Sequence, residues 1–279
     1  MRVFISADIE GITGVCHVKQ ADDLGSPAWR EACRFMRADV DAALEGCLSA
    51  GVEEIVVSDG HYDGDNLSAD GLPAGVSLVS GAQQGLSMME GIGEGFDAAL
   101  FVGYHAMAGT QAAVLAHTWN GELARVTLVD EAGGVRREVG ELGLNAAVAG
   151  AFGVPAVFAS GDDKLALEAQ AIVPGIVTAA VKEGISRTAA MLHDPSTARA
   201  AIRAGVERAL RADRRPGPLR WDDRSLELEF GRAEWCDKAA ACPGTRRLDG
   251  RRLLIPAAAH VGYLAVYRAF VVCATLAEG

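Results

Sequence analysis

VFISADIE, residues 3–10, is the stretch that decides the fold of this chain. Residues 3–7 form a short, largely apolar run, which stops abruptly at Asp8 and is followed by a polar loop that contains several glycines. An apolar run of this length is typical of a strand buried in a sheet. Two carboxylates, Asp8 and Glu10, directly follow the run, so the sequence predicts a polar site at the end of this strand.

The same pattern returns three times along the chain. Residues 54–58, 98–103 and 155–160 are apolar runs, and polar side chains follow each of them directly. Between the first two strands, residues 27–50 carry apolar side chains at three- and four-residue spacing, which predicts a helix that Gly51 ends. A second helix is expected over residues 141–152. Strands that alternate with helices predict βαβ units and therefore an α/β fold with a largely parallel sheet flanked by helices.

The remaining segments predict a smaller C-terminal α+β part. A weaker strand is expected at residues 76–79 and a hairpin at 124–138. Composition changes at DRRPGP, residues 213–218, which is the best candidate for a linker. Beyond it we expect a half-exposed strand, a hairpin and a closing helix, at residues 226–230, 246–255 and 257–277. We therefore divide the chain into a catalytic α/β domain, residues 1–212, and a C-terminal region, residues 213–279.

Composition restricts the class of protein. With 26 basic and 37 acidic residues the formal net charge is −11, so we expect no nucleic-acid partner. We expect no secretory signal at the start of the chain. Its best apolar stretch, residues 255–276, contains His260 and Arg268 and is typical of a docked helix. We expect no membrane span. The six cysteines include no C-x-x-C pair, which predicts reduced thiols and a cytoplasmic protein.

Potential metal ligands collect at the ends of the predicted strands. The first strand leads to Asp8 and Glu10, the second to Asp59 and His61, and the third to His105. Ligand sites of open α/β sheets lie beyond the carboxyl ends of the strands, so these side chains are expected to meet. Carboxylates and imidazoles suit zinc, and also manganese or cobalt. Two close metal ions polarise a carbonyl and lower the pKa of a shared water.

Each of these residues also has a purely structural interpretation. Asp8 can satisfy a turn, and His61 and His105 can be buried, hydrogen-bonded histidines. Glu141 stands at the start of a predicted helix, where a carboxylate favours the helix dipole. Two histidines together with Asp-x-Glu at three strand ends favour a site over these separate explanations. The leading prediction is a dinuclear metal site with five ligands: Asp8, Glu10, His61, His105 and Glu141.

Two further segments are candidates for a supporting or catalytic role. His117, in LAHTWN at residues 115–120, follows His105 by twelve residues and is a candidate acid, base or nucleophile. Asp162 and Asp163 follow the strand at residues 155–160. They can form a helix N-cap or a loop that faces substrate.

These segments, in this order, resemble a known family. The chain is similar to the D-aminopeptidases of the DppA type, metallopeptidase family M55, from residue 1 to about residue 190. The matching motifs are SADIEGITG at 6–14, SDGH at 58–61, LFVGYHA at 100–106, GELGLNA at 140–146, SGDD at 160–163, and TAAVK with ISR at 178–187.

The resemblance implies a ligand arrangement as well as an activity. Asp8 would bridge two zinc ions, Glu10 and His61 would complete one site, and His105 and Glu141 the other. The family's candidate catalytic histidine corresponds to His117. The resemblance also implies hydrolysis of the N-terminal D-residue of short peptides and a large homo-oligomer that encloses its active sites.

Three functions are therefore compatible with the sequence. The leading hypothesis is a zinc-dependent D-aminopeptidase that acts on short peptides containing D-amino acids, such as D-Ala-D-Ala. A second is a dinuclear metal amidase or esterase that acts on another small molecule, because specificity depends on cavity walls that a sequence does not reveal. A third is a non-catalytic metal- or peptide-binding protein whose ions have no open coordination position.

Overall fold

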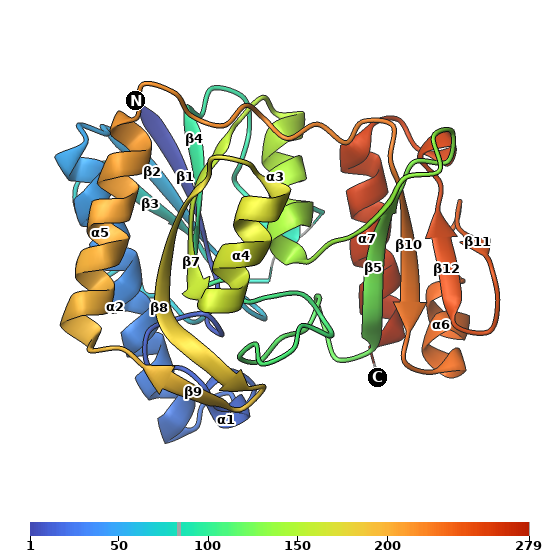
Figure 1. Cartoon of the computed structure of the whole chain (residues 1–279), viewed down its shortest axis with the longest axis horizontal. Helices are drawn as coiled ribbons and strands as arrows, with labels where there is room; N and C mark the ends of the chain where they lie inside the picture. Colours follow the sequence, from blue (N-terminus) through green and yellow to red (C-terminus); the bar gives the residue numbers. More distant parts are fainter. Residues whose placement is uncertain (83–84, 279) are drawn as a thin grey trace.

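The computed structural model describes residues 1–82 and 85–278 and contains a seven-stranded and a five-stranded sheet (Figure 1). All neighbouring strands of the larger sheet are parallel except the last pair. Its strands, in spatial order, are β3 (Val76–Val79), β2 (Glu54–Asp59), β1 (Arg2–Ala7), β4 (Ala98–Val102), β7 (Ala156–Asp162), β8 (Val177–Ser186) and β9 (Ala189–Leu192). The predicted α/β fold with a largely parallel sheet is confirmed.

The central strands are buried on both faces, which explains their continuous apolar sequences. Every residue of β4 is buried, as are the last five residues of β1. Such strands belong to parallel sheets that helices cover on both sides. In the register, Ala7 is paired with both Asp59 and Val102, so β1, β2 and β4 end at the same level. Side chains that follow these three strands therefore emerge at one edge of the sheet.

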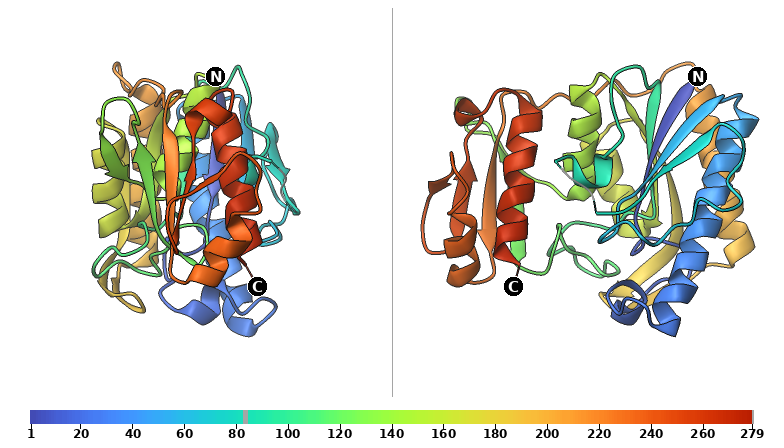
Figure 2. Two further views of the ribbon diagram at one scale, coloured as in Figure 1. Left: turned by 90° about the vertical axis from the view of Figure 1, so that its right-hand side faces the viewer. Right: turned by 180° about the vertical axis from the view of Figure 1, so that it is seen from behind.

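Helices cover both faces of the larger sheet (Figures 1 and 2). One face is covered by α2 (Pro27–Ser49) and α5 (Pro195–Arg211), which pack against each other, and the opposite face by α3 (Glu141–Ala151) and α4 (Asp163–Ile172). The Ser26 hydroxyl accepts a hydrogen bond from Trp29 N and caps α2, and Gly51, with φ of 81°, follows its end. The shorter helices are α1 (Val18–Ala21), η1 (Ser87–Met89), α6 (Ala233–Ala239) and η2 (Ala257–Ala259).

The second sheet combines strands from two distant parts of the chain. In spatial order it contains β11 (Arg246–Arg247), β12 (Arg252–Ile255), β10 (Ser225–Phe230), β5 (Leu123–Val129) and β6 (Arg136–Glu138), all antiparallel. The closing helix α7 (Tyr263–Ala277) packs between this sheet and α3 (Figures 1 and 2). The hairpin from residues 123–138 thus crosses the proposed boundary at 212/213 to join the C-terminal strands. That boundary stays a prediction.

Details of the C-terminal part differ from the expectations. The closing helix begins at Tyr263 and not at Ala257, because η2 and Gly262, with φ of 77°, interrupt it. Strand β10 is buried and not half-exposed. Its Glu227 lies under Arg136 and Arg252, at 2.8 and 3.4 Å, and these arginines shield the carboxylate from solvent. Gly279 lies outside the described residues.

Two features of the whole chain concern its environment. Among residues 1–82 and 85–278, no helix is long and apolar enough to cross a lipid bilayer. All six cysteines are free thiols, and four of them are buried, as expected for structural cysteines.

Candidate metal centre

The carboxyl edge of the larger sheet holds the polar site that the sequence predicts. Asp8 and Glu10 follow β1, His61 follows β2, and His105 follows β4. Glu141 is the first residue of α3, so the helix directs its carboxylate toward the strand ends. All five side chains are at most 6% exposed. The structure therefore brings together five ligand candidates that are spread over more than 130 residues of sequence.

Two glycines let the loops after β1 and β4 approach each other. A Cβ atom on Gly11 would lie 1.9 Å from the carbonyl oxygen of Tyr104. A Cβ atom on Gly103 would lie 2.3 Å from the carbonyl oxygen of Asp8, and its φ of +76° also favours glycine. The amide of Gly11 donates to the carbonyl of Gly103 at 2.7 Å. The backbone of the site is compact because neither position carries a side chain.

The two oxygens of Asp8 face two different histidines. Asp8 Oδ1 lies 3.4 Å from Nδ1 of His61, and the same nitrogen lies 3.5 Å from Glu10 Oε2. Asp8 Oδ2 lies 3.5 Å from Nε2 of His105, which is 3.3 Å from Glu141 Oε1. The cluster thus has two halves, and Asp8 contributes one oxygen to each.

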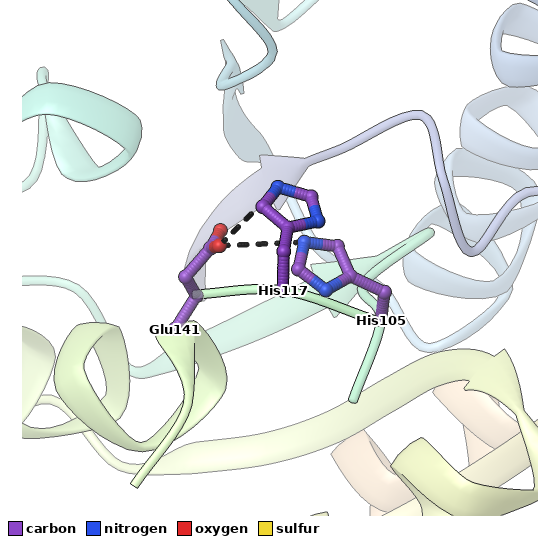
Figure 3. A group of neighbouring side chains, drawn as sticks. All are labelled: His105, His117 and Glu141. Carbon is purple, nitrogen blue, oxygen red and sulfur yellow. Dashed lines mark ion pairs between the residues drawn. The ribbon is translucent and has the colours of Figure 1, made fainter. Parts of the chain in front are cut away.

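His117 lies at the edge of the second half. Its Nε2 is 3.8 Å from Glu141 Oε1, and its ring stacks on His105 with centroids 4.0 Å apart (Figure 3). His117 is 22% exposed, whereas His105 is 2% exposed. Ligand atoms of His105, His117 and Glu141 lie within 4.8 Å of one another, as do those of Asp8, Glu10 and His105. His117 is therefore placed either to bind a cation weakly or to act beside one.

Backbone carbonyls orient all three imidazoles. Nε2 of His61 lies 3.1 Å from the Ala21 carbonyl, and Nδ1 of His105 lies 3.1 Å from the Ala106 carbonyl. Nδ1 of His117 lies 2.8 Å from the carbonyl of Leu115. A carbonyl can only accept a hydrogen bond, so each of these nitrogens carries the proton. In its neutral form each ring then presents the lone pair of its other nitrogen to the carboxylates, as metal-ligating histidines do.

The donor set fits two divalent cations. Two ligand atoms that bind one tetrahedral zinc ion at the usual distance of about 2.0–2.1 Å lie about 3.3 Å from each other. The nitrogen–oxygen distances between the histidines and carboxylates of each half of the cluster, 3.3–3.5 Å, are close to this value. Asp8 Oδ2 and Glu10 Oε2 are buried oxygens without a hydrogen-bond donor among the described residues. Buried carboxylate oxygens without a donor are costly unless a cation satisfies them. The residues that are present thus match the requirements of a carboxylate–imidazole metal site.

The charged groups of the cluster shift the pKa values of one another. Burial lowers the pKa of His61 and His105, but the neighbouring carboxylates, Glu10 and Glu141 first, raise both well above the ordinary value. Burial, and then the charge of Glu10, raises the pKa of Asp8 to about 7. The pKa of His117 is shifted in the opposite direction. Burial and the charge of His105 lower it, and these effects outweigh the neighbouring carboxylates. The lowered pKa favours the neutral form of the His117 ring.

A buried lysine holds the loop after β1. Lys182, on β8, is fully buried, and its Nζ donates to the carbonyls of Glu10, Ile12 and Val15 at 2.6, 2.9 and 2.5 Å. The Lys182 ammonium thereby satisfies three inward-pointing carbonyl groups of this loop. This role of Lys182 was not predicted from the sequence. The only signal was the position of Lys182 within the TAAVK motif.

Acidic residues of β7 and α4 hold the segment that carries His117. Asp162 accepts hydrogen bonds from Lys164 N and Leu165 N, which confirms it as the N-cap of α4. Its other oxygen accepts from Val114 N at 2.7 Å, three residues before His117. Glu168 accepts from Met107 N at 2.8 Å.

The backbone of this segment is strained at several residues. Ala112, Leu115 and Trp119 have φ of 55°, 51° and 70°, which residues other than glycine rarely adopt. The contacts from Asp162 and Glu168 hold the segment in place. Strain that surrounding contacts maintain is typical of functional segments.

Asp59 was expected to join the cluster, because it lies at the end of β2, but its carboxylate is bound within the loop that follows this strand. Its carboxylate accepts hydrogen bonds from Asn66 N, Leu67 N and the Asn66 side chain, at 2.7–2.9 Å. Asn66 also donates to the carbonyl of His61 at 2.7 Å. Asp59 therefore shapes the loop that carries His61.

A cavity of about 670 Å³ opens beside the cluster. Asp8, Glu10, His61, His117 and Glu141 form part of its wall. Other parts come from Tyr62, Trp119 and the C-terminal helix α7, which contributes Val271 and Thr275. The size of the cavity suits a small molecule or a short peptide. An α/β fold with a buried cluster of carboxylates and imidazoles beside an open cavity is the arrangement expected of a metal-dependent hydrolase.

Comparison with known proteins narrows this class to one family. The model of the family Peptidase M55, described as D-aminopeptidase, matches residues 1–271. A D-aminopeptidase of Bacillus subtilis (strain 168) is 35% identical over 254 residues, which cover 90% of this chain and 89% of that protein. The chain belongs to the M55 family of D-aminopeptidases.

A solved structure shares the whole fold. It is the Zn-dependent D-aminopeptidase DppA from Bacillus subtilis, described as a self-compartmentalizing protease. The TM-score is 0.92 at 32% sequence identity, and the match covers 99% of this chain and 98% of that one. Both the sheet and the C-terminal part are therefore common to the two proteins.

Proposed function

We propose that this protein is a dinuclear zinc aminopeptidase, which removes the N-terminal D-residue of short peptides such as D-Ala-D-Ala. The observation that carries the dinuclear proposal is the division of the Asp8 carboxylate, with one oxygen facing His61 and the other facing His105. A carboxylate divided in this way serves two cations at once. Membership of the M55 family and the zinc-dependent D-aminopeptidase of the same fold support the activity.

The five ligands divide between the two ions. Glu10 and His61 would hold one, His105 and Glu141 the other, and Asp8 would bridge them, as the spacing of 3.3–3.5 Å within each half suggests. Manganese or cobalt would fit the same oxygen and nitrogen donors. Two bound ions would polarise the scissile carbonyl and lower the pKa of a water molecule.

His117 is the chain's own group for moving a proton. The Leu115 carbonyl fixes the proton on Nδ1, so the neutral ring presents the Nε2 lone pair to the cavity. That nitrogen can accept a proton from the attacking nucleophile and return it to the leaving amine. Burial and the charge of His105 lower the pKa of His117, which keeps the ring neutral and able to accept.

One experiment tests the activity and its stereochemistry together. Zinc-loaded protein is incubated with D-Ala-D-Ala and, separately, with L-Ala-L-Ala, and the release of free amine is followed with and without a chelator. We expect release from D-Ala-D-Ala only, and its loss with chelator. Hydrolysis of esters or other amides without hydrolysis of D-Ala-D-Ala would favour the related amidase or esterase. Tight metal binding without any hydrolysis would indicate a binding protein.

We also propose that the chain forms a large homo-oligomer. The structural relative is described as self-compartmentalizing, which supports assembly of this chain as well. The apolar helix α7 is not a free surface, because it is docked on its own protein through buried residues that include Tyr267 and Phe270. Apolar side chains at Ile185, Met191 and Val261 are 51–97% exposed and are better candidates for contact. Light scattering that gives a mass near the single-chain value of 29.1 kDa would contradict assembly.

A further inference from the structure

The cavity beside the metal centre has an uneven distribution of charge. Apart from the three ligand carboxylates, its wall contains four more, from Asp22, Asp63, Glu122 and Glu278. Arg187 is the one lysine or arginine among the described residues of the wall. A peptide that enters this cavity brings its own C-terminal carboxylate, which every acidic side chain of the wall repels. Apart from the proposed metal ions, Arg187 is the group of the wall that attracts it with a permanent positive charge.

The backbone of Arg187 is fixed relative to the catalytic segment. Arg187 lies in the turn between β8 and β9, and its carbonyl accepts a hydrogen bond from Leu115 N at 2.8 Å. The carbonyl of Leu115 in turn orients the ring of His117. Two hydrogen bonds therefore connect the Arg187 backbone to the imidazole.

The guanidinium group of Arg187 is available for a ligand. Arg187 is exposed, and no ion pair joins it to any carboxylate among residues 1–82 and 85–278. Burial raises the pKa of Asp22, and the positive charge of Arg187 acts against this rise. The two groups nevertheless form no ion pair. A guanidinium in a cavity wall that faces no bound carboxylate is suited to bind one in bidentate geometry.

We propose that Arg187 binds the C-terminal carboxylate of the substrate, so that this protein selects short peptides with a free C-terminus. This inference rests on the proposed peptidase activity and names the group of the substrate that the cavity recognises. Each residue of an extended peptide spans about 3.3–3.6 Å. Because the Arg187 backbone is held beside the segment that carries His117, the reach of the Arg187 side chain limits the length of peptide beyond the scissile bond.

Two substrates that differ only at the C-terminus test this proposal. D-Ala-D-Ala carries the carboxylate, and its C-terminal amide has the same scissile bond without the charge. Values of kcat/KM for both are measured with zinc-loaded wild type, Arg187→Ala and Arg187→Lys. Arg208→Ala is the matched control, because Arg208 is an exposed arginine on α5 that is not part of the cavity wall.

We expect wild type to prefer the free acid. Arg187→Ala should lose about 10-fold in kcat/KM on the acid, mainly through KM, because a charge-assisted hydrogen bond to an exposed group contributes on this scale. Its activity on the amide should stay near wild type, and Arg187→Lys should retain part of the preference. Arg208→Ala should behave as wild type. Salt should reduce the preference of wild type but not the activity of Arg187→Ala.

Two results would overturn the role of Arg187. One is equal kcat/KM of wild type on acid and amide, and the other is an equal loss on both substrates in Arg187→Ala. If wild type hydrolyses neither substrate, the proposed activity fails, and calorimetric titration of D-Ala-D-Ala into zinc-loaded His117→Ala protein decides on Arg187 separately. If the double variant His117→Ala/Arg187→Ala binds D-Ala-D-Ala as tightly as His117→Ala does, the proposed role of Arg187 is refuted. Binding that is about 10-fold weaker in the double variant would support this role.

Discussion

Replacing Lys182 by methionine removes a buried cation and keeps most of the side-chain volume. The Nζ of Lys182 donates to the carbonyls of Glu10, Ile12 and Val15, so it holds the loop that carries the proposed ligand Glu10. Methionine offers no donor to these three oxygens. We therefore expect Lys182→Met to destabilise the protein and to weaken the half of the metal site that contains Glu10 and His61.

The size of the effect follows from two opposing contributions. Three hydrogen bonds from an ammonium group contribute about 2 kcal/mol each, about 6 kcal/mol in all. Burial opposes this, because it lowers the pKa of Lys182 from 10.5 to about 8. At 1.36 kcal/mol per pKa unit this is a cost of about 3 kcal/mol. The net loss in Lys182→Met is about 3 kcal/mol, which lowers Tm by about 6–12 °C in a chain of this size.

Thermal unfolding in chelator measures this loss without a contribution from bound metal. Zinc competition titrations then measure the affinity of the folded variant, where we expect one of the two sites to weaken. Lys164→Met is the matched control, since Lys164 undergoes the same chemical change but is partly exposed at the start of α4. A Lys182→Met protein with the Tm and both zinc affinities of wild type would refute the role of Lys182.

Two other substitutions test the proposed catalytic residue His117 and the supporting residue Glu168. His117→Ala should retain both zinc ions and the native fold but lose about 10²-fold or more in kcat on D-Ala-D-Ala, and near-normal turnover by the metallated variant would remove His117 from the mechanism. Burial raises the pKa of Glu168 to about 7 from 4.5, so the folded protein holds this proton more tightly than the unfolded chain does. The corresponding stability, about 3 kcal/mol, is present below pH 4.5 and is lost as the pH rises through 7. Glu168→Gln cannot titrate, so the Tm of this variant should lack the corresponding fall between pH 4.5 and 7. Identical profiles of Tm against pH for the two metal-free proteins would contradict the raised pKa of Glu168.

The sequence was sufficient for the central sheet because its strands are buried on both faces. The apolar runs before Asp8, His61 and His105 have the length of strands, and their polar ends mark one edge of the sheet. The convergence of the five ligand candidates and His117 followed from this topology together with the family resemblance. Which of them bind metal stays a prediction.

Other features depend on contacts that no local pattern contains. Strands β8 and β9 were not predicted, and β8 brings Lys182 under a loop that lies about 170 residues earlier, a pairing that only the folded topology creates. The hairpin of residues 123–138 was predicted, but its place beside β10 was not, because strand pairing between distant segments leaves no periodic signal. Asp59 was grouped with the ligand candidates, but its carboxylate is occupied by the backbone of residues 66 and 67.

The metal content of Asp8→Ala tests the dinuclear centre most directly. Asp8 contributes one oxygen to each half of the cluster, so its loss should affect both ions, whereas His61→Ala and His105→Ala should each weaken mainly one. Asp63→Ala is the control, because Asp63 is a carboxylate of the same cavity outside the ligand cluster. Elemental analysis of carefully loaded protein should find about two zinc ions per chain in wild type and Asp63→Ala, and essentially none in Asp8→Ala. One ion per chain in wild type, or two retained in Asp8→Ala, would contradict a dinuclear centre bridged by Asp8.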